Sequence, residues 1–212
     1  DHTVNPADDK LAMYEIKKSI SLLVSYEDRN FDIGTAVLNI NKRKLNNLIT
    51  EYLNPFLEIE NFKLGLGVGD NKYQKNLPNY SNNLEEVISY LIENFDISKE
   101  GKNIFLGGNS NQNIQIMKKY SVGINQWLGS LSELYKTREL YKKIDRPMGS
   151  ISLCINKDLY LKNRKIFDDI ELIFLIKEES SDNFLSQIDQ FFKWVFQNDR
   201  MTYDRFTFRY SH

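Results

Sequence analysis

The chain has 212 residues, of which 41% are hydrophobic and 13% aromatic, so it can bury a sizeable core as one domain or two small ones. Its 28 basic and 29 acidic residues leave a formal net charge of -1, which gives no long-range field to recruit a nucleic acid or an anionic membrane. The only histidines are His2 and His212, and the single cysteine is Cys154, so histidine triads, zinc clusters and intrachain disulfides are not expected in the interior. We therefore expect a cytoplasmic protein with no cofactor and no metal.

The first third of the chain predicts strands and a helix separated by polar loops. Residues 1–13 lack the apolar core of a signal peptide and are interpreted as a flexible lead-in or a cloning remnant. Apolar runs at 19–26 and 33–40 flank a polar segment and predict a hairpin. Residues 45–56 have helical spacing, with Asn41 as the expected cap and Pro55 at the expected end. A glycine-bearing strand is predicted at 62–68.

The middle of the chain predicts further helices around a short strand. Residues 84–95 have helical spacing, and Asn82 and Glu85 stand at the positions of a capping box. "NIFLGG" at 103–108 predicts a strand, and "GGNSNQN" is expected to cap the next helix, with anion binding at that helix start as the alternative. This helix is expected to be interrupted near Gly123 and to continue through Trp127 to Tyr141.

Pro147 and Gly149 mark the start of a β-rich final segment. It predicts strands at 150–156 and 170–176, an aromatic helix at 184–196 and a closing strand at 205–211. The alternation in "SISLCIN" predicts a buried cysteine. Three acidic residues before and within the second strand are expected at a solvated strand entrance rather than in a metal site: Asp168, Asp169 and Glu171.

These elements predict an α+β fold with a mixed or antiparallel sheet and amphipathic helices packed on it. "KSISLLVSYEDR" and "GSISLCINKDLY" share a tetrapeptide, which allows a pseudo-duplicated strand-helix unit. We expect a first α+β part at 14–146 and a second, β-rich part at 147–212, packed together as a single compact body.

The stretch "NFKLGLGVGDNKYQKN" at 61–76 places Gly65, Gly67 and Gly69 at alternate positions of the predicted strand. Such spacing removes side chains from one face and lets a backbone or a ligand approach closely. Neither a dinucleotide fingerprint nor a phosphate loop fits, because both need their glycines at a turn into a helix. We expect this strand to be internal to the sheet. Its apolar residues are expected to face the core: Leu64, Leu66 and Val68.

Residues 19–95, from "SISLLVSYEDRNFDIG" through "FKLGLGVGD" to "PNYSNNLEEVISYLI", resemble nucleotide-cyclase and diguanylate-cyclase-like (GGDEF) palm domains, most of all the SatD group. The resemblance implies a nucleotide site. The family's hairpin tip Gly-Asp-Glu-Phe stands here as "YEDRNF", and no preceding strand carries the metal-binding aspartate, so two-metal phosphoryl transfer is not expected. The candidate ligand-binding residues are Glu27, Asp28, Gly65, Gly67, Gly69 and Asp70.

The segment from "SISLCINKDLY" to "WVFQND" is similar to the C-terminal part of mannitol-type phosphotransferase IIA domains. The phosphorylated histidine of those domains follows a Gly-Ile-Ala-like run. The nearest stretch here, "SVGINQW", contains no histidine, so a phosphoryl relay is excluded. The resemblance implies a regulatory domain without the relay.

Together these features favour a non-catalytic binding or regulatory module encoded by a low-GC, bacterium-like genome. The alternatives are a degenerate nucleotide-binding palm and a IIA-like regulatory domain. Trp194 lies off the apolar stripe of its predicted helix, which predicts contact with a protein partner or with a second copy of the chain. A nucleotide stays an allowed ligand, whereas a membrane and a nucleic acid are not expected.

Overall fold

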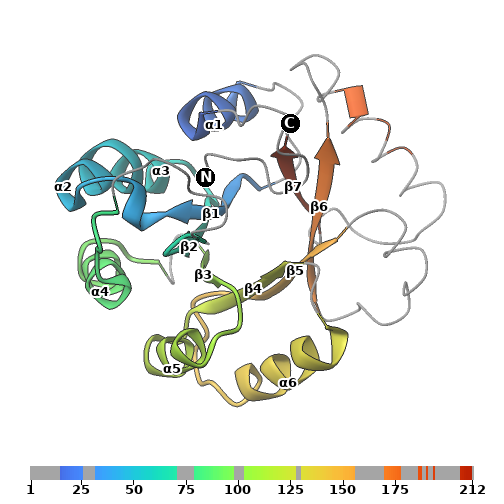
Figure 1. Cartoon of the computed structure of the whole chain (residues 1–212). Helices are drawn as coiled ribbons and strands as arrows, with labels where there is room; N and C mark the ends of the chain where they lie inside the picture. The colour runs from blue at the N-terminus through green and yellow to red at the C-terminus, as the bar shows by residue number, and fades with distance from the viewer. Residues whose placement is uncertain are drawn as a thin grey trace.

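The computed structural model describes residues 15–25, 32–70, 79–97, 103–127, 130–155, 170–177, 186–187, 190, 193 and 206–211, with the backbone alone for 174–177 and 206–211. Seven strands in this part of the chain form one sheet in sequence order, and every neighbouring pair is parallel. The sheet curls until its last strand comes beside its first (Figure 1). The architecture is therefore an open α/β barrel.

The strands are short and share one direction, so their carboxyl ends gather at one end of the barrel. Their bounds are β1 (Gly34–Asn39), β2 (Lys63–Gly67), β3 (Asn103–Gly107), β4 (Gly123–Trp127), β5 (Ile151–Ile155), β6 (Glu171–Lys177) and β7 (Phe206–Ser211). The ladder between β4 and β5 continues the sheet across the segment that contains Pro147 and Gly149.

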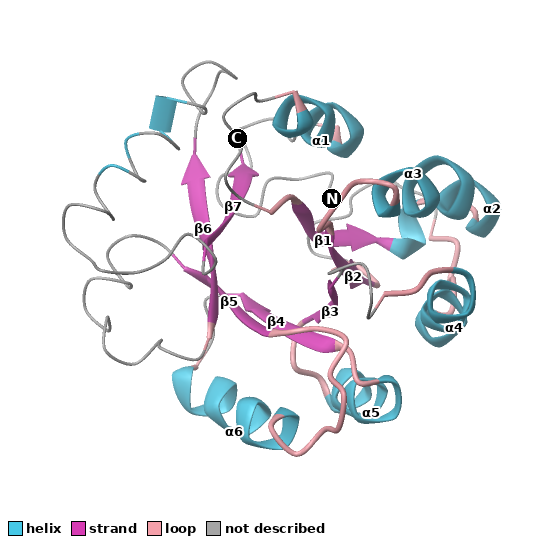
Figure 2. Ribbon diagram, turned by 180° about the vertical axis from the view of Figure 1, so that it is seen from behind, coloured by secondary structure: helices cyan, strands magenta, loops and turns pink. Residues whose placement is uncertain are grey.

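Helices lie outside the ring that the strands form, and within the described residues they connect the strands from β1 to β5 (Figure 2). Their bounds are α1 (Ile16–Val24), η1 (Ile40–Lys42), α2 (Leu45–Leu48), η2 (Ile49–Leu53), α3 (Asn54–Leu57), α4 (Leu84–Asn94), α5 (Asn111–Tyr120) and α6 (Leu131–Tyr141). This placement is expected, because a parallel sheet needs crossover connections that cover its face. No helix in the described part of the chain is long and apolar enough to cross a membrane.

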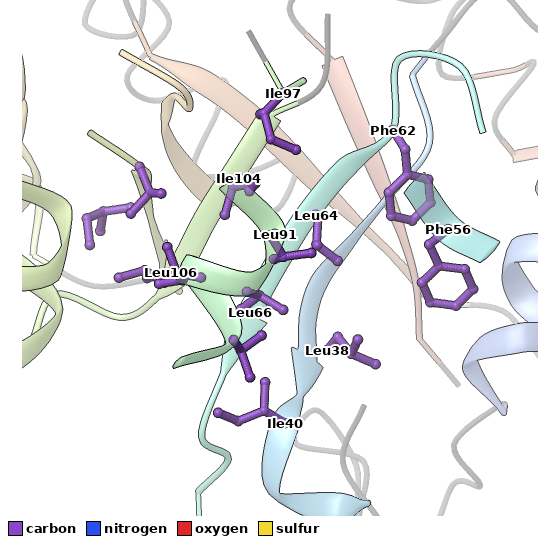
Figure 3. Packing of buried hydrophobic residues seen from close by; sticks show 14 of the residues in the cluster. Leu38, Ile40, Phe56, Phe62, Leu64, Leu66, Leu91, Ile97, Ile104 and Leu106 are labelled. Carbon is purple, nitrogen blue, oxygen red and sulfur yellow. The ribbon is translucent and has the colours of Figure 1, made fainter. Parts of the chain in front are cut away.

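Alternate residues of the described strands near α4, α5 and α6 pack outward in the main core. Leu64 and Leu66 of β2 are fully buried and lie near Leu91 of α4 in the main core (Figure 3). Residues of opposite orientation face the barrel interior, where a smaller cluster forms. Its members are Phe105, Cys154 and Ile173, with Ala36 and Val37 packed against them.

The expected mixed or antiparallel α+β sheet is wrong, because every ladder is parallel and strands alternate with helices. Residues 19–24 of the run predicted as the first strand of a hairpin belong to α1. Ile16, Ile20 and Leu23 have helical spacing, Ile20 and Leu23 are buried, and the side chain of Glu15 caps the helix. The duplicated unit is wrong for the same reason, since the shared tetrapeptide is helical at 19–22 and enters a strand at 151.

The other strands predicted from apolar runs are confirmed, as are the helical stretches near 45–56 and 84–95. β4 was missed: the segment read as an interrupted helix is a strand paired on both sides. Lys44, not Asn41, precedes α2, and Pro55 lies in the first turn of α3 rather than at the end. Most of the helix predicted at 184–196 and all of the predicted lead-in lie outside the described residues.

Candidate ligand site at the carboxyl ends of the strands

The glycines of β2 pack against protein groups inside the barrel. β2 is internal, as predicted, with β1 on one side and β3 on the other. A Cβ atom on Gly65 would lie 2.1 Å from the carbonyl oxygen of Thr35 and 2.5 Å from the Phe105 ring. On Gly67 it would lie 2.6 Å from a methyl group of Val37. The space beside Gly65 and Gly67 is thus filled by groups of neighbouring strands, and no ligand is needed to explain these two glycines.

The predicted ligand-binding residues are only partly placed. Gly65 and Gly67 belong to β2, whereas Gly69 and Asp70 follow it at the carboxyl end of the barrel, with Gly69 at a φ of 82°. Leu64 and Leu66 are buried as predicted, but Val68 is 49% exposed, so its expected core position is wrong. Three of the predicted site residues lie outside the described residues: Glu27, Asp28 and Trp194.

Buried carboxamides are concentrated at the carboxyl ends of β1 and β4. Asn39, Asn41, Asn125 and Gln126 are each at most 8% exposed. Burying an amide is costly unless it is hydrogen-bonded, and barrel interiors are usually filled by branched apolar side chains. A carboxamide can both donate and accept hydrogen bonds without changing its charge. This end of the barrel is therefore equipped for polar recognition.

On the β3–β4 side, hydrogen bonds hold the carboxamides in place. Asn125 donates from Nδ2 to Oγ of Ser152 over 3.0 Å, and its Oδ1 lies 3.5 Å from Sγ of Cys154, whose thiol donates to it. Nδ2 of Asn109 donates to Oε1 of Gln126 over 3.2 Å. The buried state predicted for Cys154 is confirmed. The side chains that follow β3 are thereby fixed to β4.

The loop between β3 and α5 is also rigidly bonded. Oγ of Ser110 accepts from the backbone N–H of Asn113, which confirms the capping interpretation of "GGNSNQN". Nδ2 of Asn113 donates back to the carbonyl oxygens of Gly107 and Gly108 over 3.0 and 2.9 Å. Gly108 has a φ of 89°, and no heavy atom lies within 4 Å of the position where its Cβ would be. The loop therefore leaves open space beside a fixed backbone.

On the β1–β2 side, Asn41 links the two strand ends. Its Nδ2 donates to the carbonyl oxygen of Val68 over 3.1 Å, and its backbone N–H donates to Oδ1 of Asn39 over 2.9 Å. Oδ1 of Asn41 is buried and has no hydrogen-bond partner among the residues that the structure describes. The pairing register shifts between Thr35 and Leu38. Irregular strands of this kind are common at barrel rims and next to binding sites.

Apolar groups complete this end of the barrel. Val37 is half-buried and its methyl groups lie 3.0 Å from where a Cβ of Gly107 would be, so it reaches from β1 across β2 to β3. Trp127, at the end of β4, is 37% exposed. We call the following residues the carboxyl-end site: Val37, Gly107, Gly108, Asn109, Asn125 and Trp127.

Two charged residues near this end, Lys42 and Arg43, lie in the segment that leads from β1 to α2. Burial lowers the pKa of Lys42, and the neighbouring Arg43 lowers it further, against weaker opposing effects of Tyr52 and Glu15. Tyr52 and Glu15 belong to η2 and to the start of α1, outside the ring of strands. Among the side chains that the structure describes, the interior residues of the carboxyl-end site include no acid and no base.

A second polar cluster, which the sequence did not predict, lies at the opposite, amino end. Lys63 and Glu171 form an ion pair there with side chains that are each 12% exposed. The expectation that Glu171 lies at a solvated strand entrance is therefore wrong. Asp168 and Asp169 lie outside the described residues. The available signal in the sequence was a charged residue at the start of each of the two strands, Lys63 in β2 and Glu171 in β6.

Comparison with protein-family models, with curated proteins and with solved structures finds no match to the chain. The resemblances to palm domains and to IIA domains gain no support from these comparisons. The acidic hairpin that a palm domain requires is not formed by the described residues, because 16–24 is a helix. The geometry of the barrel therefore carries the functional interpretation.

Proposed function

We propose that the protein is a non-catalytic binding or regulatory module that holds a small organic molecule at the carboxyl-end site. The observation that supports this most strongly is the concentration of buried carboxamides at the carboxyl ends of β1 and β4. Parallel α/β barrels bind their ligands at this end, and small-molecule sites combine apolar walls with a few convergent polar groups. Val37 and Trp127 supply apolar surface here, while Asn109 and Asn125 supply the amides.

The same residues argue for binding rather than for turnover. A carboxamide orients a ligand through hydrogen bonds but does not titrate, so it is no general acid or base. Asn125 uses one donor and one acceptor on Ser152 and Cys154, which leaves hydrogen-bonding capacity for a ligand. The polar edge of a nucleobase meets this requirement, so a nucleotide is kept as one ligand class. A cytoplasmic location and partner contact through Trp194 stay part of the proposal.

A ligand screen on the full chain tests the proposal. Nucleosides, nucleotides, sugars and heteroaromatic metabolites are screened by thermal shift, since a ligand at a hundred times its dissociation constant adds about 2.7 kcal/mol of stability. The site of each hit is then located by hydrogen exchange. We expect protection at 107–110 and 125–127. Protection confined to the amino ends of the strands would contradict the proposal.

Two asparagines provide a matched pair of variants. Asn125 and Asn103 each donate from Nδ2 to a serine hydroxyl over 3.0 Å, at opposite ends of the barrel. We expect Asn125→Ala to weaken ligand binding about tenfold, the equivalent of about 1.4 kcal/mol, and Asn103→Ala to leave it unchanged. Calorimetric titration measures both. Equal loss in the two variants would mean that the barrel as a whole, and not this site, determines binding.

A further inference from the structure

A series of polar side chains crosses the amino end of the barrel, opposite the carboxyl-end site. Lys63 begins β2 and Glu171 begins β6, and the two side chains form an ion pair although β2 and β6 are not neighbours in the sheet. Nζ of Lys63 also lies 3.2 Å from Oδ2 of Asp32, which precedes β1. One ammonium group is thus held between two carboxylates from different parts of the barrel.

Glu171 extends the series towards β3. The hydroxyl of Ser150 donates to Oε2 of Glu171, and Nδ2 of Asn103 donates to Oγ of Ser150 over 3.0 Å. Ser150 immediately precedes β5, and Asn103 begins β3. The contacts therefore join the starts of five strands through side chains alone.

The ring of strands has a seam between β7 and β1. Parallel ladders connect each strand to the next from β1 to β7, but within the described residues no ladder joins β7 back to β1. The two strands nevertheless come beside each other, as Figure 1 shows. The described residues show no ladder across this edge, so side-chain contacts that span it can contribute to closing the sheet.

We propose that the Lys63–Glu171 ion pair, with Asp32 as the second carboxylate, is a latch that holds the seam of the barrel closed at its amino end. Lys63 and Asp32 belong to the β1–β2 edge, and Glu171 belongs to the β6–β7 edge, so the contact spans the seam from inside. Burial acts to lower the pKa of Lys63, but the carboxylates of Glu171 and Asp32 outweigh it and raise the pKa, so the latch is charged at neutral pH.

Hydrogen exchange on the full chain separates a latch from a residue that only adds global stability. In Lys63→Met, we expect amides of the seam strands β1 and β7 to exchange at least about tenfold faster, under conditions where amides of β3 and β4 are unchanged. Asp32→Asn keeps the buried pair and should show a smaller change at the same strands. This second variant gives a readout if Lys63→Met does not fold.

The matched control is Lys119→Met, which breaks an exposed ion pair with Glu85 that links α5 to α4 and does not cross the seam. We expect its exchange at β1 and β7 to equal that of the unmodified chain. A uniform acceleration across all strands in the Lys63 and Asp32 variants, or no change at β1 and β7, would overturn the latch.

Discussion

Gly65 shows why a single residue type is required at one position of β2. Because Gly65 has no side chain, the backbone oxygen of Thr35 can lie close to it. This oxygen cannot move away easily, because the ladder between β1 and β2 fixes the backbone of Thr35. Gly67 faces only a methyl group of Val37, and a side chain can rotate where a backbone cannot. The two glycines look equivalent in sequence but differ in what surrounds them.

We expect Gly65→Ala to destabilise the fold by about 3 kcal/mol or more, because the new methyl group would overlap backbone and ring atoms. Gly67→Ala should cost about 1 kcal/mol, since Val37 can adjust. Urea unfolding of both variants measures the difference. Equal costs at the two positions would show that the close approach to Thr35 relaxes easily.

Sequence patterns located the buried residues better than the polar ones. The alternation around Cys154 and Leu64 was enough to predict their burial, because burial follows from apolar character and period. The partners of Asn125 and Glu171 could not be predicted, since Ser152 and Lys63 are brought to them by strands that are distant in sequence. A polar residue in a strand is explained only when its neighbours across the barrel are known.

The start of α4 shows how an element is attached to the barrel. Asn83, not the predicted Asn82, caps the helix by accepting from the backbone N–H of Glu85. Asn82 instead donates from Nδ2 to the carbonyl oxygens of Ile40 and Arg43 over 2.6 and 2.7 Å. The helix is therefore anchored to the segment that follows β1, next to the carboxyl-end site.

We expect Asn82→Ala to cost about 2 kcal/mol, because it leaves two backbone acceptors without their donor. Asn83→Ala should cost about 1 kcal/mol, the usual loss for a helix cap. Chemical denaturation gives both values, and hydrogen exchange should show that only the Asn82 variant loosens residues 40–43. Faster hydrogen exchange confined to the start of α4 in both variants would indicate that Asn82 acts as a capping residue, as the sequence predicts.

Helices and strands could be predicted where the length of an apolar segment and its hydrophobic period indicated the same element. They were missed where the two indicated different elements. "GINQW" has no apolar run, and only Ile124 and Trp127 of its five residues favour strands. It becomes β4 because β3 and β5 pair with it on both sides. "SISL" lies in a helix at 19–22, whereas its second copy at 150–153 enters a strand at Ile151, so tertiary packing decides its conformation. The helical period of the first copy becomes visible only when Ile16 and Leu23, which lie outside the tetrapeptide, are included.

For the whole molecule, the alternation of strands with helices after residue 33 was visible in the sequence, and such alternation favours a parallel sheet. The apolar run in α1 is also compatible with a strand, which predicts a hairpin at the start of the chain and therefore an antiparallel sheet. The curling into a barrel was not predictable from local pattern. It depends on cross-barrel contacts such as that of Lys63 with Glu171, which join residues far apart in the chain.

The pH dependence of unfolding concerns the whole molecule, because two half-buried groups, Lys63 in β2 and Tyr141 in α6, contribute in the same direction. The pKa of Lys63 is raised above 10.5, against the effect of burial, by Glu171 and Asp32. Burial raises the pKa of Tyr141 from 10.0 to about 12, although the N–H of Gly149 donating to its hydroxyl oxygen lowers it slightly. A raised folded-state pKa stabilises the fold fully below the unfolded value and ceases to do so as the pH passes the folded value.

We therefore expect the free energy of unfolding to fall as the pH rises above about 10, since the unfolded chain then loses these protons before the folded chain does. Lys63→Met and Tyr141→Phe should each make the decline shallower, because each removes one titrating group. Lys42, whose pKa is lowered by burial and by Arg43, acts in the opposite direction, so Lys42→Met should make the decline steeper. Urea unfolding at a series of pH values between 8 and about 11 measures all four slopes. Identical slopes in the Lys63 and Tyr141 variants and in the unmodified chain would show that alkaline unfolding is governed by other groups.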